Sequence, residues 1–145
     1  MEFKNAPDTV DAILEKDNKV LMIKRKGDTF KGHLAMPGGY VDYGETVEAA
    51  VIREAKEELN LDVTPKAILG VYSGKKRDPR GAIISIVFIC DFKGQPRAGD
   101  DASDFEWLDL KNLEKEKLAF DHKQILTHYK QYKKNKGQGT FWTGK

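Results

Sequence analysis

Glutamates are concentrated at residues 38–61, in the stretch GGYVDYGETVEAAVIREAKEELNL. An α-helix turns by about 100° per residue, so a helix here would place Glu54, Glu57 and Glu58 on one face. Like charges three or four residues apart destabilise an isolated helix by about 0.2–0.5 kcal/mol per pair, so helix stability does not account for the pattern. Carboxylate oxygens are the ligands that Mg²⁺ and Mn²⁺ prefer. The spacing therefore indicates a site for a divalent cation, which would offset the repulsion.

Two other charged residues of this stretch have a different expected role. Arg53 can pair with Glu57 one helical turn later, or reach back to Glu45 near the helix start, where a carboxylate also meets the favourable end of the helix dipole. We therefore expect Glu45 and Arg53 to be structural. The alternative for the whole acidic face is that solvent, Arg53 and Lys56 neutralise it and that it binds no ion.

An apolar stripe would position this helix. It recurs every four residues on a different face, at Val47, Val51, Ala55 and Leu59. The stripe can pack on a sheet while the carboxylates stay outside. We expect the helix to run from about residue 45 to 59 and to end at Asn60, because asparagine tolerates the left-handed conformation of helix ends. The preceding Pro37-Gly38-Gly39 segment is typical of a turn.

Apolar runs with alternation or β-branched residues predict the strands. They are TVDAILEKD and KVLMIKRK, joined by a hairpin at Asp17 and Asn18; AILGVYSG and AIISIVFICDF, paired antiparallel; and SDFEWLDL, which contributes Trp107 to the core. A last helix is expected at about 121–134, with Asp121 as its candidate cap. The order of strands, helix, strands and helix indicates an α/β (α+β) fold in which a sheet packs between helices.

Composition narrows the class of protein. A chain of 145 residues, 39% hydrophobic and 33% charged, is expected to form one soluble domain, 1–145. No run approaches the roughly 18 apolar residues of a membrane span, and a net charge of +2 gives no case for nucleic acid. The lysine-rich end from about residue 135 is expected to be a flexible tail, with an RNA-contacting segment as the alternative. Cys90 is the only cysteine and lies in an apolar run, so we expect a buried thiol and a cytoplasmic protein.

The acidic stretch resembles the signature of the Nudix hydrolase family: glycine, five residues, glutamate, seven residues, then Arg-Glu-apolar-any-Glu-Glu-any-Gly-apolar. The matching positions are Gly39, Glu45, Arg53, Glu54, Ala55, Glu57, Glu58, Asn60 and Leu61. Asn60 departs from the usual glycine, but asparagine is the next best residue for a left-handed helix end. The resemblance implies a Nudix-type α/β/α sandwich with a mixed central sheet.

The resemblance also implies chemistry. Nudix enzymes hydrolyse a nucleoside diphosphate linked to another group by attack of water on phosphorus, with Mg²⁺ or Mn²⁺ as cofactor. By position, Glu57 and Glu58 are the main metal ligands, Glu54 is a further ligand or the base, and the Gly39 carbonyl is a backbone ligand. Some members take the base from a later loop, for which Asp101 is our candidate among Asp100, Asp101, Asp104 and Glu106.

The segments SGKKRDPRGAIISIVF and LAFDHKQIL are similar to segments of ADP-ribose pyrophosphatase-like Nudix proteins. Arg77 and Arg80 could contact a diphosphate bidentately, unless the loop is an ordinary exposed basic turn, and Arg25 is a further phosphate ligand by analogy. His122 is expected to cap or pack beside Phe120.

The resemblance thus implies hydrolysis of ADP-ribose to AMP and ribose 5-phosphate. A nucleoside triphosphate pyrophosphohydrolase, a non-catalytic ligand sensor and an RNA 5′-end processing enzyme are the alternatives. Relatives often dimerise, so a homodimer is expected, with a small nucleotide as substrate.

Overall fold

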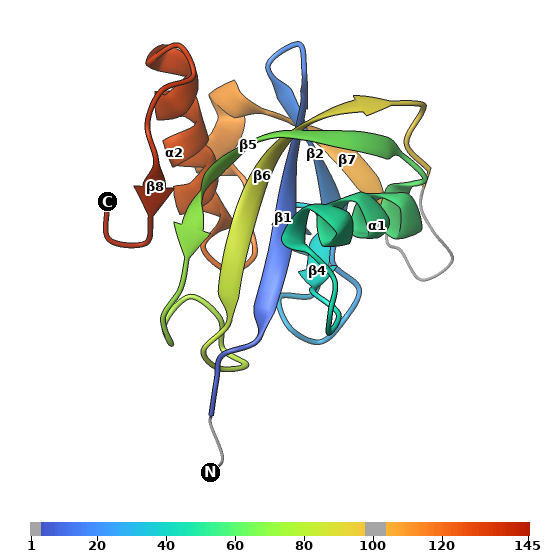
Figure 1. Cartoon of the computed structure of the whole chain (residues 1–145). Coiled ribbons are helices and arrows are strands. Elements are labelled where there is room, and N and C mark those ends of the chain that lie inside the picture. The colour runs from blue at the N-terminus through green and yellow to red at the C-terminus, as the bar shows by residue number, and fades with distance from the viewer. Residues whose placement is uncertain (1–3, 98–103) are drawn as a thin grey trace.

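The computed structural model describes residues 4–97 and 104–145. Its elements follow the order expected from the sequence (Figure 1). They are β1 (Asp8–Lys16), β2 (Lys19–Lys24), β3 (Leu34–Ala35), β4 (Gly38–Tyr40), α1 (Val47–Leu59), β5 (Asp62–Tyr72), β6 (Ile84–Lys93), β7 (Phe105–Asp109), the 3-10 helix η1 (Leu110–Lys115), α2 (His122–Lys134) and β8 (Phe141–Trp142). None of the described helices is both long enough and apolar enough to cross a bilayer.

The sheet is mixed. Its strands lie in the order β3-β2-β1-β6-β5-β8, with β4 paired to β1 and β7 paired to β2. β1 pairs parallel with β6, whereas β5 and β6 form the predicted antiparallel pair. The predicted β1–β2 hairpin is confirmed, and its turn residues Asp17 and Asn18 have φ of 54° and 63°, which suit a tight hairpin turn.

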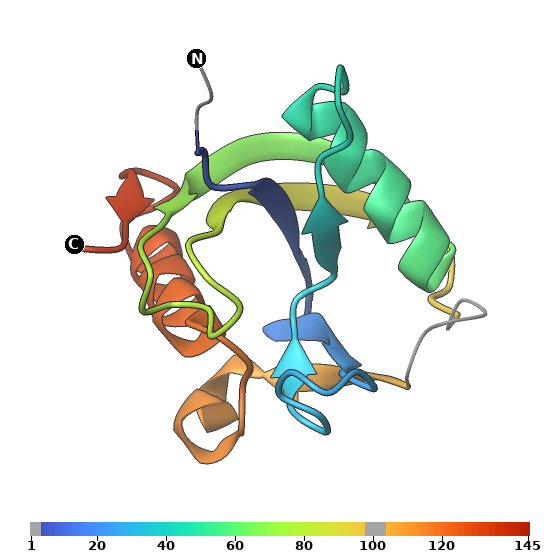
Figure 2. The same cartoon turned by 90° about the horizontal axis from the view of Figure 1, so that it is seen from below.

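The two main helices lie on opposite sides of the curved sheet (Figure 2). Alternate residues of β1 face the two sides: Ile13 packs in the core that contains Ile125 of α2, while Leu14 packs in the core that contains Val51 of α1. Successive side chains of a strand point to opposite faces, so one strand serves both cores. The predicted α/β/α sandwich with a mixed central sheet is confirmed.

Helix α1 begins and ends at residues that the sequence marks. The Thr46 hydroxyl accepts a hydrogen bond from the Ala49 N–H, so the helix starts at Val47 and Glu45 lies just outside it. Asn60 adopts φ 57° and ψ 34°, the predicted left-handed end. The expected apolar stripe is buried only in part on its first turn, because Val47 is half-buried whereas Val51 is fully covered.

The segment Pro37-Gly38-Gly39 is not a turn as expected, because Gly38 and Gly39 form β4 and pair with β1. A Cβ at Gly38 would lie 2.0 Å from the Val10 carbonyl oxygen, so only glycine allows this close pairing. Gly38 therefore serves backbone packing at the sheet and not a change of chain direction.

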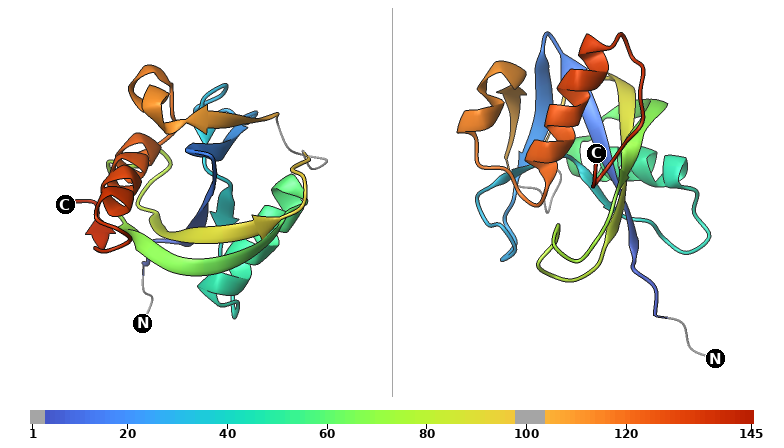
Figure 3. Two further views of the ribbon diagram at one scale, coloured as in Figure 1. Left: turned by 90° about the horizontal axis from the view of Figure 1, so that it is seen from above. Right: turned by 90° about the vertical axis from the view of Figure 1, so that its left-hand side faces the viewer.

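The chain after Lys134 differs from the expected flexible tail. β8 pairs parallel with β5 and lies beside α2, and Phe141 is 2% exposed (Figure 3). A Cβ at Gly70 would lie 2.1 Å from the Phe141 carbonyl oxygen, so a glycine near the C-terminal end of β5 makes room for the tail. Burial of the Phe141 ring against the core is the physical reason for the docking.

Candidate active site

A cavity of about 210 Å³ brings together residues from distant parts of the chain. From the predicted set, its lining includes Gly39, Glu58, Arg25, Arg77 and Arg80. Glu54 lies against the lining residue Gly39, and Glu57 directly precedes Glu58 on α1. Acidic and basic groups thus meet at one opening, as a site for a diphosphate and its counter-ions requires.

Glu58 is the buried member of the acidic face. Its Oε1 accepts a hydrogen bond from the Gly38 N–H at 2.8 Å. Burial raises the pKa of Glu58 to about 8, and the neighbouring charges of Glu54 and Asp11 add to this effect. Water solvates the buried Glu58 carboxylate only weakly, so this carboxylate would stabilise a cation that lies close to it.

Glu54 packs directly against Gly39. A Cβ at Gly39 would lie 2.4 Å from Glu54 Oε1, so the absence of a side chain gives this carboxylate its place. Burial also raises the pKa of Glu54, although a hydrogen bond from Arg53 Nη1 at 2.9 Å opposes the shift. The glycine of β4 and the carboxylate of α1 fit one another as a pair.

Arg53 holds the acidic cluster together. Its Nε and Nη2 donate to the two oxygens of Glu45 at 2.8 and 2.9 Å, and its Nη1 lies 3.3 Å from Glu57. Nη2 also donates to the Tyr40 carbonyl, which ties the helix to β4. Hydrogen bonds from Arg53 lower the pKa of Glu45 to about 2. This geometry is that of an architectural ion pair and supports the structural roles expected for Glu45 and Arg53.

Two of the three predicted arginines share an aromatic platform. The guanidinium carbons of Arg25 and Arg80 lie 4.8 and 5.2 Å from the centroid of the Phe120 ring. Arg80 also makes a bidentate pair with Asp78 at 3.0 and 2.8 Å, and Arg25 donates to the Thr29 carbonyl. Burial lowers the pKa of Arg25, and the nearby Arg80 lowers it further. An anion between the two guanidinium groups would relieve their repulsion.

Arg77 has a different environment from the one expected for a substrate ligand. Its side chain is 5% exposed and makes a bidentate pair with Asp121 at 2.8 and 3.0 Å. Its Nη1 donates to the Ile83 carbonyl at 3.3 Å. Arg77 thus anchors its loop to the start of α2, and Asp121 uses its carboxylate for this pair instead of capping the helix as expected.

Comparison with known proteins decides the family. A family model described as NUDIX domain matches residues 6–129. The chain belongs to the Nudix family. An ADP-ribose pyrophosphatase of Methanocaldococcus jannaschii is 58% identical over 125 residues, which are 86% of this chain and 73% of that protein.

Two solved structures support the same placement. The NUDIX domain of Shewanella oneidensis NrtR, complexed with ADP ribose, is 26% identical, with a TM-score of 0.77 over 89% of each chain. A bifunctional NMN adenylyltransferase/ADP ribose pyrophosphatase of Francisella tularensis, complexed with AMP and a Mn ion, is 32% identical. It matches with a TM-score of 0.77 over 90% of this chain and 43% of that one.

The Nudix carboxylates are not gathered around a common point. Over residues 4–97 and 104–145, no group of three or more Asp, Glu, His or Cys side chains is arranged to hold an ion. Glu54 and Glu57 face Arg53, and Glu58 faces the Gly38 N–H. The donor set nevertheless fits Mg²⁺ or Mn²⁺ in type, because three hard carboxylates lie within about one turn of one helix. The residues that would hold the ion are Glu54, Glu57 and Glu58, with the Gly39 carbonyl.

Some residues of the site were missed or assigned differently. Asp11 of β1 lines the cavity, and its sequence signal was a single acid within a buried apolar run. His122 packs beside Phe120 as expected, with ring centroids 5.4 Å apart, but it also lines the cavity, and its Nδ1 accepts a hydrogen bond from the Met36 N–H at 3.0 Å. Asp101, the candidate base, lies outside the described residues.

Proposed function

We propose that this Nudix chain hydrolyses ADP-ribose to AMP and ribose 5-phosphate with Mg²⁺ or Mn²⁺. The observation that carries the proposal is that Glu58 of the Nudix helix lines the same cavity as Arg25 and Arg80. The 58% identity to a protein named ADP-ribose pyrophosphatase supports the choice of substrate. ADP-ribose has the diphosphate that such a cavity would bind between its acidic and basic groups.

The basic groups bind and orient the diphosphate. A guanidinium presents parallel N–H donors that match phosphate oxygens. Arg80 is 39% exposed at its side chain and can exchange its contacts to Asp78 for contacts to a phosphate. Arg25 is more enclosed, and its Nε is already bound to Thr29, so it offers its Nη groups from a fixed position.

The acidic groups hold the ion and accept a proton. A bound divalent cation neutralises the diphosphate oxygens and lowers the pKa of the attacking water. The water oxygen forms a bond to phosphorus as the bond to the bridging oxygen breaks, and a carboxylate takes the proton that the water loses. Glu54 is a candidate for this base because burial raises its pKa. Asp101 is the second candidate.

The test is hydrolysis of a panel with Mg²⁺ or Mn²⁺ and an EDTA control: ADP-ribose, nucleotide sugars, a dinucleoside polyphosphate and nucleoside triphosphates. Glu57→Gln and Glu58→Gln should each lose most activity and stay folded. The matched control is Glu48→Gln, on the exposed first turn of the same helix. Preference for a triphosphate would keep the site and refute the substrate. Tight binding of ADP-ribose without turnover would instead support a non-catalytic sensor.

The state of the protein in the cell is part of the same proposal. We place it in the cytoplasm, supported by the buried Cys90 thiol, and as a homodimer, as the family resemblance implies. We propose that nucleic acid is not a partner, so RNA should compete only weakly with ADP-ribose for binding. Light scattering over a range of protein concentrations tests the dimer, and a monomer at every concentration would refute it.

A further inference from the structure

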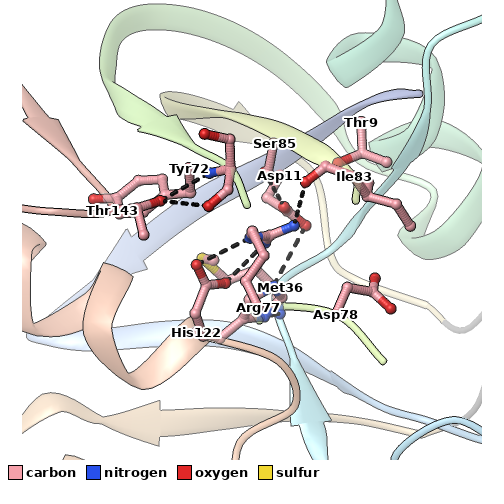
Figure 4. A network of polar contacts seen from close by, with 12 residues as sticks. Thr9, Asp11, Met36, Tyr72, Arg77, Asp78, Ile83, Ser85, His122 and Thr143 are labelled. Carbon is pink, nitrogen blue, oxygen red and sulfur yellow. Dashed lines mark hydrogen bonds and ion pairs between the residues drawn. The ribbon is translucent and has the colours of Figure 1, made fainter. Parts of the chain in front are cut away.

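Asp11 is a buried carboxylate with an unused acceptor. It lies on β1 among buried apolar residues, and its side chain is 12% exposed toward the cavity that it lines. Oδ2 accepts a hydrogen bond from the Ser85 hydroxyl at 2.5 Å (Figure 4). Within residues 4–97 and 104–145, Oδ1 has no hydrogen-bond donor. A buried carboxylate with a single neutral donor is costly, so a further donor is expected when the cavity is filled.

Among the residues that the structure describes, His122 provides an unused donor beside Asp11. Because Nδ1 accepts the Met36 N–H, the proton of the neutral ring is on Nε2. Burial lowers the pKa of His122, which keeps the ring neutral. Nε2 lies 3.9 Å from Asp11 Oδ1, which is too far for a hydrogen bond between them. The cavity is thus lined by one donor and one acceptor that do not satisfy each other.

The separation selects the kind of group that can bind there. An oxygen about 2.8 Å from each of the two atoms can bridge a gap of 3.9 Å, provided that it both accepts and donates. A hydroxyl does both. A phosphate oxygen at neutral pH has no proton to donate and would be repelled by Asp11, and an ammonium group cannot accept from Nε2–H.

We propose that Asp11 and His122 form a subsite for a ribose hydroxyl of the substrate. The hydroxyl donates to Asp11 Oδ1 and accepts from His122 Nε2–H, while the arginines of the same cavity bind the diphosphate. The identity of the sugar rests on the proposed hydrolysis of ADP-ribose. Both riboses of ADP-ribose carry hydroxyls, so the experiment compares the two.

The experiment measures kcat/KM on ADP-ribose and on analogues that each lack one hydroxyl of one ribose. For the wild type, loss of the bound hydroxyl should lower kcat/KM by about tenfold or more, as expected for a hydrogen bond to a charged group. Asp11→Asn should lower kcat/KM on ADP-ribose by a similar factor, with no further loss on that one analogue. The analogue that shows this non-additivity identifies the ribose.

Asp62→Asn, an exposed change on β5, is the control and should match the wild type on every substrate. His122→Gln keeps an N–H donor and provides a second variant if Asp11→Asn unfolds. Equal losses on all analogues would overturn the proposal in favour of a structural role, and no loss on any would mean that only water occupies the subsite.

Binding without turnover separates this proposal from the function. Calorimetry in EDTA compares AMP with its deoxy analogues and ribose 5-phosphate with 2-deoxyribose 5-phosphate and its other deoxy analogues. If the wild type fails to hydrolyse ADP-ribose, the proposed function fails. The subsite then stands if one deoxy analogue binds more weakly to the wild type but not to Asp11→Asn, and it falls if none does.

Discussion

Gly38 and Gly39 are adjacent, yet alanine at the two positions should have opposite effects. At Gly38 the new Cβ would lie 2.0 Å from the Val10 carbonyl oxygen, a backbone atom. At Gly39 it would lie 2.4 Å from Glu54 Oε1, the far end of a flexible side chain. Backbone must separate in the first case, whereas a carboxylate can rotate away in the second. We expect Gly38→Ala to lower stability and Gly39→Ala to lower activity.

The magnitudes follow from what each change displaces. Gly38→Ala must push β4 from β1 and break the Gly38 N–H bond to Glu58. Overpacking costs about 1–3 kcal/mol and a lost neutral hydrogen bond about 0.5–1.5 kcal/mol, so we expect a loss of about 3 kcal/mol. For a chain of this size that lowers Tm by about 6–12 °C. Gly39→Ala should cost about 1 kcal/mol or less in stability, but a displaced Glu54 should lower kcat about 100-fold.

The assay pairs urea unfolding in EDTA with kcat on ADP-ribose. Gly27→Ala is the control for the glycine-to-alanine change, because a Cβ there has no heavy atom within 4 Å. If Gly39→Ala is destabilised as much as Gly38→Ala, the distinction between backbone and side-chain contacts is refuted. If Gly39→Ala keeps the kcat of Gly27→Ala, the position of Glu54 does not matter for the reaction.

Three further predictions concern the arginine loop, the buried glutamate and the C-terminal strand. Arg80→Ala should raise KM for ADP-ribose by about 10- to 100-fold and lower kcat less, and a loss confined to kcat would contradict its binding role. Burial raises the pKa of Glu58 to about 8, so the native state keeps this proton to a higher pH than the unfolded state does. The stability that results is fully present below the unfolded pKa near 4.5 and is lost as pH rises through about 8. The free energy of unfolding of the wild type in EDTA should therefore fall relative to that of Glu58→Gln from about pH 5 to about pH 9, and a constant difference would refute the shift. Gly70→Ala should undock β8 and lower the free energy of unfolding by about 2–3 kcal/mol, because Phe141 becomes exposed. The control Gly144→Ala, whose Cβ would be 3.8 Å from its nearest neighbour, should keep the wild-type stability. Equal stability of the two variants would count against the docking.

Local patterns in the sequence were enough to predict the acidic helix. The period of the apolar stripe, the left-handed residue Asn60 and the spacing of the carboxylates all depend on residues within α1 or next to it. The hairpin at Asp17 and Asn18 is equally local. Features of this kind are determined by neighbours along the chain, so periodicity and turn chemistry predict them.

The incorrect predictions depend on contacts between distant residues. Asp121, which was expected to cap α2, pairs instead with Arg77, 44 positions away in the sequence, and no pattern around either residue indicates that partner. Docking of β8 had a signal that was not used: Gly70 interrupts an otherwise well-formed strand, which is typical of close approach by another backbone. The turn expected at Gly38 and Gly39 failed for the same reason, because glycine serves close packing as well as turns.

Arg53 offsets part of the repulsion among the carboxylates of α1 before an ion binds. Its bonds to Glu45, at 2.8 and 2.9 Å, are shorter than its contacts to Glu57, at 3.3 and 3.4 Å. A cation that draws Glu57 away therefore breaks the weaker contacts, and Glu45 keeps the guanidinium in place. Arg53 also donates to the Tyr40 carbonyl, which ties α1 to β4 next to the Gly39 carbonyl. The arginine thus reduces repulsion in the metal-free helix without blocking the site.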